Sequence, residues 1–309
     1  MNNLFYEEAG AKKLLGRCVS SKTPIDRKRV AMWSREQFSH VITPGVVGMI
    51  HLPALPGSPA WAGSIEAVEE FALVDAHTLV GSGMNALMIE NYHDVPFHPT
   101  SVPAETIAAM SRLIMSIRHA FPEVKIGVNV LRNDVAAALA IAVATRAHFV
   151  RVNVHVGATV TDQGPIIGEA WQTLRKRKEL GADHGKDYIG IMADVRVKHA
   201  RPMVERPLGE EAQDLRLRGL ADAIIVTGTA TGSGADPGDI ALVREALPDC
   251  PLLVGSGVTE ATVADFLPAA DGCIIGSSLK EEKTGNAQAP VSPDRCQKFM
   301  RAFAAINNR

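Results

Sequence analysis

The sequence has no long apolar run, and neither sign of charge is in large excess. No segment of the 309 residues approaches the length of about 18 uninterrupted apolar residues that indicates a transmembrane helix. The formal net charge is -2, whereas dedicated nucleic-acid-binding domains usually have a basic surplus. We therefore expect neither an integral membrane segment nor a nucleic-acid partner.

The sequence has few cysteines, and its first residues lack the apolar region of a secretory signal. The four cysteines (Cys18, Cys250, Cys273 and Cys296) form no CxxC pair and have no metal-like spacing, so we expect free thiols. Cys273 lies in an apolar run and is expected to fill the core rather than act as a nucleophile. The first residues, MNNLFYEEAGAKKLL, lack an apolar signal region, which favours a cytoplasmic location.

The phosphate loops of open nucleotide-binding sheets are also absent. The first β-branched run leads into HLPALPGSP, which matches neither GxGxxG nor GxxxxGK[ST]. From residue 46 onward the chain instead repeats one unit, a short apolar run followed by a polar or glycine-rich turn and a helical stretch. The glycine-rich turns come last in this series, which favours a barrel over an open sheet.

Eight such runs start 21 to 40 residues apart, so each interval has room for a crossover helix and parallel pairing. The predicted fold class is therefore an α/β (β/α)₈ barrel of the TIM type, whose usual size the repeats match. The runs are VVGMIH (46–51), ALMIEN (86–91), KIGVNVL (125–131), FVRVNVHV (149–156), YIGIMADV (188–195), AIIVTGT (223–229), PLLVGSG (251–257) and GCIIGSS (272–278).

Residues 1–43 differ in charge from the remainder of the chain. They contain eight Lys/Arg and four Asp/Glu, although the chain as a whole is slightly acidic. We expect two parts, an N-terminal helical extension over 1–43 and one barrel domain over 44–309. A solvated helix packed under the barrel is the simpler interpretation of the extension, and a partner-binding or membrane-surface role is the alternative.

Glycine-serine turns follow the last two predicted strands. Glycine lets the backbone approach a ligand closely, successive N–H groups can converge on an anion, and barrels frequently bind phosphate in these two loops. We expect Thr259 to cap the helix that follows the seventh strand. The alternative is that these are plain turns. The predicted phosphate-binding residues are Gly228, Gly255, Ser256, Gly257, Gly276 and Ser277.

Polar residues stand at the ends of the first five runs. In the fourth run Arg151, Asn153 and His155 alternate with valines, so a period of two puts all three on one face. Active sites of such barrels lie at the carboxyl ends of several strands, so we expect these side chains to share one rim. The predicted substrate-binding residues are His51, Asn91, Asn129, Asn153 and His155.

Two carboxylates, Glu90 and Asp194, follow apolar runs and need an explanation, since buried charges are rarely unpaired. Each is either half of a buried salt bridge, for instance with Arg151 or Lys198, or part of an acid/base or hard-cation site. Lys198 is able to pair with phosphate, donate a proton or form an imine. The predicted catalytic residues are Glu90, Asp194 and Lys198. If a cation takes part, Mg²⁺ or Mn²⁺ is favoured over Zn²⁺, because oxygen ligands dominate.

The stretch GATVTDQGPIIGEAW (157–171) follows the fourth run and has no clear periodicity until Ile166. Long structured loops are uncommon unless they are functional. It is either a lid over the site or a surface excursion.

Five segments together resemble the BtpA/SgcQ family: GMIHLPALPGSP, MIENYHDVPF, RVNVHVGATVTDQG, ADVRVKHA and DAIIVTGTATG. The resemblance covers about residues 44–280 and implies a barrel of the phosphate-binding type. Members are variously described as factors for photosystem I biogenesis, proteins of a sugar-utilisation operon, or phosphatases, so the family leaves the reaction open. The chain departs from the common pattern at Ala54, His93 and Arg196, and Arg196 is expected to alter the charge near the site.

Two functions from different classes fit these observations. The first is an enzyme acting on a phosphorylated small molecule such as a sugar phosphate, by isomerase, epimerase, lyase or hydrolase chemistry. The second is a non-catalytic assembly factor that keeps an anion pocket. Carboxylates retained at strand ends favour the enzyme. The sequence leaves the reaction, the metal dependence and a homo-oligomeric state open.

Overall fold

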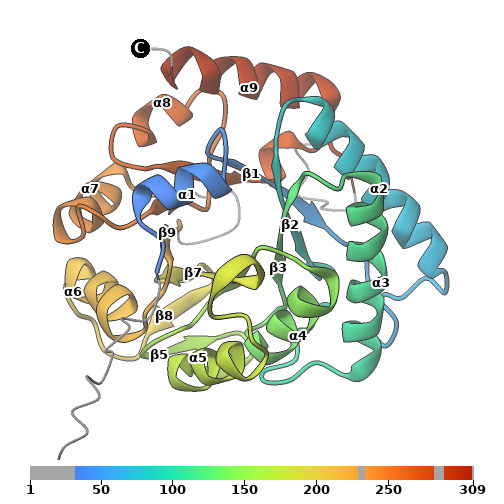
Figure 1. The fold of residues 1–309 in the computed structure, drawn as a ribbon, viewed down its shortest axis with the longest axis horizontal. Coiled ribbons are helices and arrows are strands. Elements are labelled where there is room, and N and C mark those ends of the chain that lie inside the picture. The colour runs from blue at the N-terminus through green and yellow to red at the C-terminus, as the bar shows by residue number, and fades with distance from the viewer. Residues whose placement is uncertain (1–31, 229–233, 282–288, 308–309) are drawn as a thin grey trace, which may run out of the picture. The chain divides into compact units, whose positions relative to one another are not determined.

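The computed structural model describes residues 32–228, 234–281 and 289–307, in which eight parallel strands close into a barrel. The strands follow the order β1-β11-β10-β9-β7-β4-β3-β2 around the barrel. Figure 1 shows them enclosed by a ring of helices. Each of the eight runs contributes one strand and every neighbouring pair is parallel, which confirms the predicted fold. Their bounds are β1 Val46–His51, β2 Ala86–Glu90, β3 Lys125–Asn129, β4 Phe149–Val152, β7 Gly190–Val195, β9 Ala223–Val226, β10 Leu252–Val254 and β11 Gly272–Ile275.

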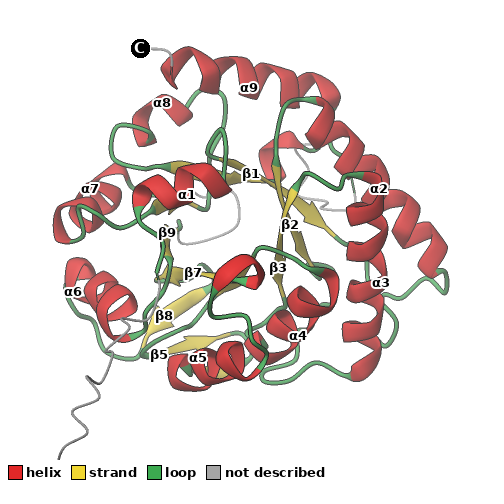
Figure 2. Cartoon of the chain, in the orientation of Figure 1, coloured by secondary structure: helices red, strands yellow, loops and turns green. Residues whose placement is uncertain are grey.

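Helices occupy the intervals between the barrel strands and lie outside them, as Figure 2 shows. Several begin at side-chain caps, including Ser64 before α2 and Asp134 before α4, because these oxygens accept from otherwise unbonded N–H groups. The helices are α1 Arg35–Val41, α2 Ile65–Gly81, α3 Ala104–Ala120, α4 Val135–Thr145, α5 Ala170–Glu179, α6 Leu208–Gln213, α7 Pro237–Ala246, α8 Val263–Phe266 and α9 Pro293–Asn307, with short turns η1 Gly185–Asp187, η2 Asp214–Arg218 and η3 Ser277–Leu279.

The barrel interior changes from apolar to polar along the strands. On β1, Val47 and Met49 face the interior cluster while Val46 and Ile50 pack against the outer helices, so the period of two places His51 inside. The registers of the neighbouring strands set His51, Glu90 and Asn129 side by side. A polar layer therefore lies above the apolar one, at the carboxyl end of the barrel. The apolar layer contains Val47, Met49, Ala86, Met88, Phe149, Met192, Ala223, Ile225, Leu253 and Ile274.

Helix α1 closes the opposite, amino end of the barrel. Trp33, Phe38 and Ile42 are buried in the same cluster as the interior strand residues. The fit at Trp33 is close, since a Cβ added to Gly190 would lie 2.1 Å from its indole ring. Of the predicted extension over 1–43, residues 32–43 thus pack into the barrel mouth, and residues 1–31 lie outside the described part of the chain.

Two aspartates hold this closing segment in place. Asp222 accepts hydrogen bonds from the Trp33 backbone N–H at 3.1 Å and from the buried Arg177 guanidinium at 2.9 Å. Asp271 pairs with Arg35 at 2.7 Å and with Arg244 at 2.6 Å. Because both aspartates directly precede barrel strands, they tie the segment before β1 to the amino ends of β9 and β11.

A small antiparallel sheet stands beside the barrel where the lid was proposed. Strands β5 (Ala158–Thr161) and β6 (Gly164–Ile167) form a hairpin, and β5 also pairs with β8 (Ala200–Pro202). The predicted loop over 157–171 is thus mostly regular structure. Its partner strand β8 belongs to the loop after β7, so the hairpin holds the segment that carries Lys198.

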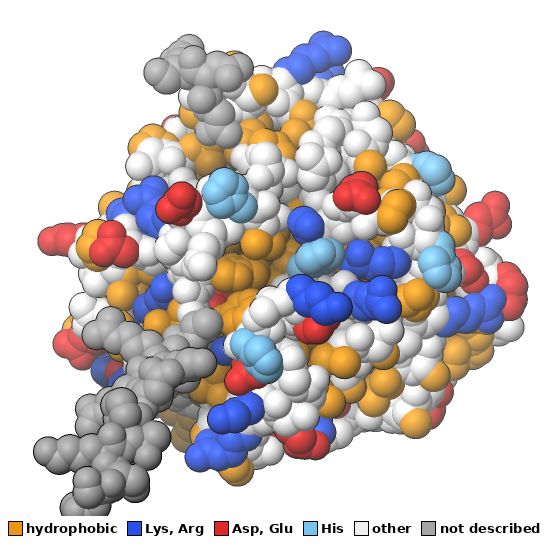
Figure 3. Space-filling view, in the orientation of Figure 1, with side chains coloured by type: hydrophobic (Ala, Val, Ile, Leu, Met, Phe, Trp, Pro, Cys, Tyr) orange, Lys and Arg blue, Asp and Glu red, His pale blue; other side chains and the backbone are white. Residues whose placement is uncertain are grey.

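The surface drawn in Figure 3 carries both acidic and basic side chains. No helix among the described residues combines the length and hydropathy needed to cross a bilayer. Cys250, Cys273 and Cys296 are free and buried, and Cys273 lies in the core, as predicted. Burial raises the pKa of the Cys273 thiol to about 12.

Candidate functional site

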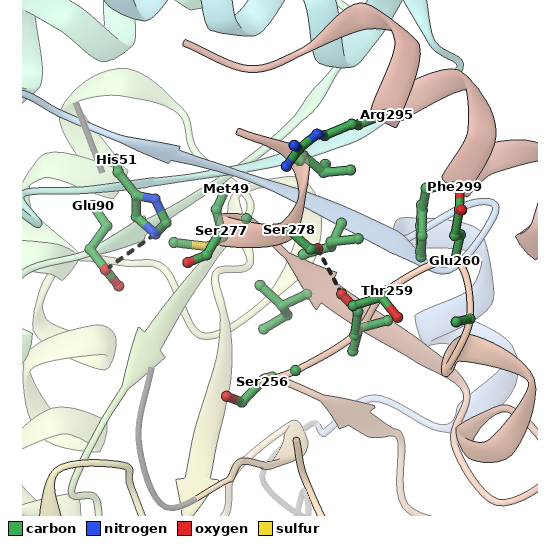
Figure 4. A pocket seen from close by; sticks show the side chains of 18 of the residues that line it. Met49, His51, Glu90, Ser256, Thr259, Glu260, Ser277, Ser278, Arg295 and Phe299 are labelled. Atoms are coloured by element: carbon green, nitrogen blue, oxygen red, sulfur yellow. Dashed lines mark hydrogen bonds and ion pairs between the residues drawn. The ribbon is translucent and has the colours of Figure 1, made fainter. Parts of the chain in front are cut away.

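A cavity of about 590 Å³ opens at the carboxyl ends of the barrel strands. The inner part of the cavity is the region lined by His51, Glu90, Arg151 and Lys198. The outer part is the region lined by residues 259–261, Arg295, Lys298 and Phe299. In Figure 4, His51 and Glu90 lie on one side and Glu260 and Phe299 on the other, with Ser277 and Ser278 between them. The two glycine-serine turns line the middle of the cavity, through residues 255–258 and 276–279.

The turn after β10 contains two glycines, and each position requires glycine for a different structural reason. A Cβ on Gly255 would lie 2.5 Å from Cγ2 of Ile225, so only glycine fits against the neighbouring strand. Gly257 adopts a positive φ of 67°, which side-chain-bearing residues rarely take. Ser256 between them is buried. Residues 255–258 line the cavity, although the Gly255 N–H is taken by the Val226 carbonyl at 2.8 Å.

The turn after β11 leads into η3. The first hydrogen bond of η3 runs from the Leu279 N–H to the Gly276 carbonyl at 2.9 Å. The N–H groups that begin a helical turn have no partner within it, so those of Ser277 and Ser278 are placed to meet an anion. The Ser278 hydroxyl donates to the Val258 carbonyl at 2.7 Å and links the two turns.

The expectation that Thr259 caps the following helix is wrong. Helix α8 begins at Val263 with Thr262 as its N-cap residue, and it has only four residues. Thr259 instead shares a turn with Thr262, whose backbone N–H donates to the Thr259 hydroxyl at 3.2 Å. A helix this short adds little dipole, so the backbone turns carry the anion prediction alone.

Glu90 ends β2 with its carboxylate at the cavity wall. Its side chain is 6% exposed, Oε2 accepts from the Asn129 amide at 2.5 Å, and Oε1 lies 3.9 Å from Nε2 of His51. No Lys or Arg in the described part of the chain forms an ion pair with it. Glu90 is therefore a carboxylate facing the cavity with a neutral hydrogen-bond partner.

His51 contacts the same cavity as a neutral imidazole. Burial, with Lys280 and Lys198 nearby, lowers its pKa well below the usual 6.5, so its approach to Glu90 is not an ion pair. Its Nδ1 is buried without a hydrogen-bond partner. Among the described residues this makes Nδ1 an exception, since buried polar atoms are usually bonded.

Asp194 is engaged differently from Glu90. Its carboxylate accepts from Arg151 Nε at 3.0 Å and Nη2 at 3.1 Å, and from the Asn153 amide at 2.8 Å. The two charged side chains are 0% and 2% exposed. Asp194 does not line the cavity, whereas Arg151 does. Of the two alternatives for the carboxylates, Asp194 thus takes the buried salt bridge.

Lys198 lies in the loop after β7 and lines the inner part of the cavity. Burial, with Arg151 close by, lowers the pKa of its ammonium group. Arg132 donates to the Lys198 carbonyl at 2.7 Å, and β8 begins two residues later. The backbone on both sides of Lys198 is thus held, which positions its side chain near Glu90.

Four other predicted residues, Asn91, Asn129, Asn153 and His155, do not line the cavity. Strand β4 ends at Val152, yet Asn153 and Arg151 both donate to Asp194, so the period of two still holds for Asn153 and fails only at His155. Nε2 of His155 hydrogen-bonds with the Gly219 carbonyl at 2.9 Å, and burial lowers its pKa to about 4. Asn91 binds the Leu131 backbone N–H at 2.7 Å and so shapes a loop. Since none of the four lines the cavity, their substrate-binding role stays a prediction of the sequence.

Gly228 and Arg196 do not contribute to the cavity, unlike the two glycine-serine turns. Gly228 is buried directly before residues 229–233, which are not described, and it does not line the cavity. The Arg196 side chain turns outward and pairs with Glu211 at 2.9 Å, so the expectation that it alters the charge of the site is not met.

The sequence analysis missed Arg295 and Lys298. Both belong to α9, which begins 14 or more residues after the last glycine-serine turn, yet both line the cavity. Arg295 lies three residues before Lys298 and four before the buried Phe299, spacings that mark one helix face, but only the closed barrel shows where that face points.

No group of three or more His, Cys, Asp or Glu side chains that could hold a metal ion occurs among the described residues. Asp194 is committed to Arg151, so Glu90 is the one predicted catalytic carboxylate that faces the cavity. A role for Mg²⁺ or Mn²⁺ stays a prediction.

Comparisons with solved structures agree with the fold. The chain resembles thiamine phosphate pyrophosphorylase from Pyrococcus furiosus, with a TM-score of 0.51, 13% identity, and coverage of 84% and 95% of the two chains. It also resembles tryptophan synthase subunit alpha from Legionella pneumophila, with a TM-score of 0.53, 16% identity, and coverage of 86% and 94%. At these identities the likeness concerns the fold alone.

Sequence relatives are much more similar. The chain is 40% identical over 259 residues to the photosystem I biogenesis protein BtpA of Synechocystis sp., covering 84% of this chain and 88% of that one. It is also 40% identical over 255 residues to an uncharacterized protein of Thermococcus kodakarensis, covering 82% and 93%. The BtpA family model matches residues 43–305. The chain therefore belongs to the BtpA family.

Proposed function

We propose that the cavity binds the phosphate of a small metabolite between the two glycine-serine turns, and that the protein is an enzyme acting on it. The position of residues 255–257 on the cavity wall and the first N–H groups of η3 support the anion site. A sugar phosphate is the substrate class that we favour. Its hydroxyl or carbonyl groups would extend from the turns toward the polar inner part of the cavity.

Glu90 is the proposed acid/base residue, and one observation supports this most directly. Glu90 lines the cavity and bonds to a neutral amide, whereas Asp194 is neutralised by Arg151 outside it. Glu90 is therefore the carboxylate that we place in proton exchange with a ligand in the cavity. Asp194 then has another role, which is to fix the position of the Arg151 guanidinium through two hydrogen bonds.

Lys198 and His51 complete the proposed chemistry. Glu90 would take a proton from a carbon next to a carbonyl, while the Lys198 ammonium group stabilises the negative charge that develops on the carbonyl oxygen. The neutral His51 would contact the substrate from the cavity wall. One carboxylate can both remove and return a proton, so isomerase or epimerase chemistry is favoured over lyase or hydrolase chemistry.

The experiment is a screen of sugar phosphates, with and without Mg²⁺ or Mn²⁺, followed by Glu90→Gln. This variant preserves shape and should still bind inorganic phosphate, but it should lose turnover by roughly 10²–10⁴-fold. Glu36→Gln removes an exposed carboxylate at the opposite end of the barrel and is the matched control. Unchanged turnover in Glu90→Gln would rule out this role.

The alternative is an assembly factor that keeps an anion pocket. It is favoured by the similarity to a protein named for photosystem I biogenesis and by the salt bridge that occupies Asp194. Phosphate binding without turnover on any compound of the screen would favour this alternative. A cytoplasmic location and a homo-oligomeric state stay predictions of the sequence.

A further inference from the structure

The outer part of the cavity presents two cationic side chains from α9. Arg295 and Lys298 line it together with Phe299, which is 1% exposed. Residues three and four positions apart lie on the same face of a helix. Packing of Phe299 against the core therefore fixes this face of α9 toward the loop that follows β10.

Within the described part of the chain, neither Arg295 nor Lys298 has an ion pair or a side-chain hydrogen bond. Arg295 is half-buried, so its guanidinium gives up part of its hydration without a protein acceptor in return. Glu260 on the facing loop is exposed and pairs with neither residue. The outer part of the cavity thus has two positive charges and one negative charge.

The outer part is separated from the inner part by the linked turns. The bond from the Ser278 hydroxyl to the Val258 carbonyl connects the two walls of the cavity at this point. Figure 4 shows Ser277 extending toward the side of His51 and Glu90, with Glu260 and Phe299 beyond Ser278. Figure 4 also shows the Arg295 side chain above Ser278, so a phosphate held at the turns would have the inner polar residues on one side and Arg295 over the turns.

We propose that Arg295 and Lys298 form a second phosphoryl subsite, so that the ligand is an organic diphosphate rather than a monophosphate. The inference rests on the proposed function, because the first phosphoryl group occupies the glycine-serine turns. Guanidinium groups bind phosphoryl oxygens in bidentate fashion, and an ammonium group adds a point charge. A second phosphoryl group gives the half-buried Arg295 the acceptor that it lacks.

The test compares inorganic phosphate with inorganic pyrophosphate by titration calorimetry at equal ionic strength. The native chain should bind pyrophosphate at least about tenfold more tightly, the scale of one charge-assisted hydrogen bond. Arg295→Ala should remove that preference and leave phosphate affinity within about twofold, while Lys298→Ala should reduce it less. Arg301→Ala removes an exposed charge from the same helix outside the cavity and should keep the preference.

Three outcomes would overturn the proposal. Equal affinities for phosphate and pyrophosphate would show that no second subsite exists. The proposed function would still stand in that case, because phosphate would still bind. Equal weakening of both anions by Arg295→Ala would place Arg295 in the first subsite. Failure of the native chain to bind either anion would overturn both this inference and the proposed phosphate site. Thermal melting of each variant establishes that it is folded.

Discussion

Arg151 and Asp194 meet across the neighbouring strands β4 and β7 in a two-pronged hydrogen-bonded pair, with N–O distances of 3.0 and 3.1 Å. Both side chains are almost fully buried. The pair lies directly beneath the cavity, since Nη2 of Arg151 would be 3.6 Å from a Cβ on Gly255. The position of the Arg151 guanidinium below the glycine-serine turn after β10 thus depends on Asp194.

Removing one partner should destabilise the protein strongly. Asp194→Ala leaves the Arg151 charge buried and uncompensated, so we expect the free energy of unfolding to fall by about 3–5 kcal/mol in urea titrations. The double variant Arg151→Met/Asp194→Leu has no buried charge and should recover much of this loss. A loss below about 1 kcal/mol for Asp194→Ala would contradict the role assigned to the pair.

The proposed phosphate site is best tested at Ser277. A bulky replacement of Ser256 is unsuitable, because that side chain is buried and a larger one would disturb the barrel. Ser277 is exposed, so Ser277→Asp should fold normally and place a negative charge beside the η3 N–H groups. Phosphate affinity, measured by calorimetry, should fall by about tenfold or more through like-charge repulsion. Ser277→Asn is the neutral control, and equal affinities in the two variants would count against the site.

Buried neutral histidines predict a loss of stability in acid. Burial lowers the pKa of His155 from 6.5 to about 4, and that of His148 likewise to about 4. The unfolded chain takes up these protons as the pH falls through 6.5, whereas the folded chain does so only near 4. The stabilisation is therefore complete above pH 6.5 and is lost between 6.5 and 4, by up to about 3 kcal/mol for the buried His155.

The measurement is urea unfolding at pH 7 and pH 4.5 for the native chain and for His155→Gln. Glutamine does not titrate and can still donate to the Gly219 carbonyl. The variant should lose less stability than the native chain between the two pH values. Parallel losses would mean that His155 does not contribute to the acid sensitivity.

The segment before β1 should contribute to barrel stability. Trp33→Ala empties a site bounded by Phe38, Tyr188 and Gly190, so we expect a cost of about 3–5 kcal/mol. Removing residues 1–43 should destabilise the barrel at least as much, because it also removes Arg35 from Asp271. Thermal melting checks both changes. Equal melting temperatures of the native and 1–43-deleted chains would show that the barrel over 44–309 is independent, as the sequence predicts.

Local sequence features were sufficient to predict the barrel strands. Runs such as VVGMIH and ALMIEN are short, rich in β-branched or apolar residues and spaced for crossover helices. These properties can be recognised in each repeat without knowledge of the rest of the chain. The position of His51 and Glu90 at the ends of their runs also predicted that they share the carboxyl end of the barrel. The period of two failed at His155 because β4 ends at Val152 and the chain then leaves the barrel.

The partners of the charged side chains depended on the tertiary structure. Glu90 and Asp194 both follow apolar runs, and nothing in their local sequence distinguishes the one paired with Arg151 from the one that faces the cavity. Arg295 reaches the site only because closing the barrel brings α9 beside the loop after β10. The sequence by itself determined the fold, because the fold follows from periodic local patterns. Only the tertiary structure decided which predicted residues line the cavity and which carboxylate is paired, because electrostatic pairing depends on distances between residues far apart in the chain.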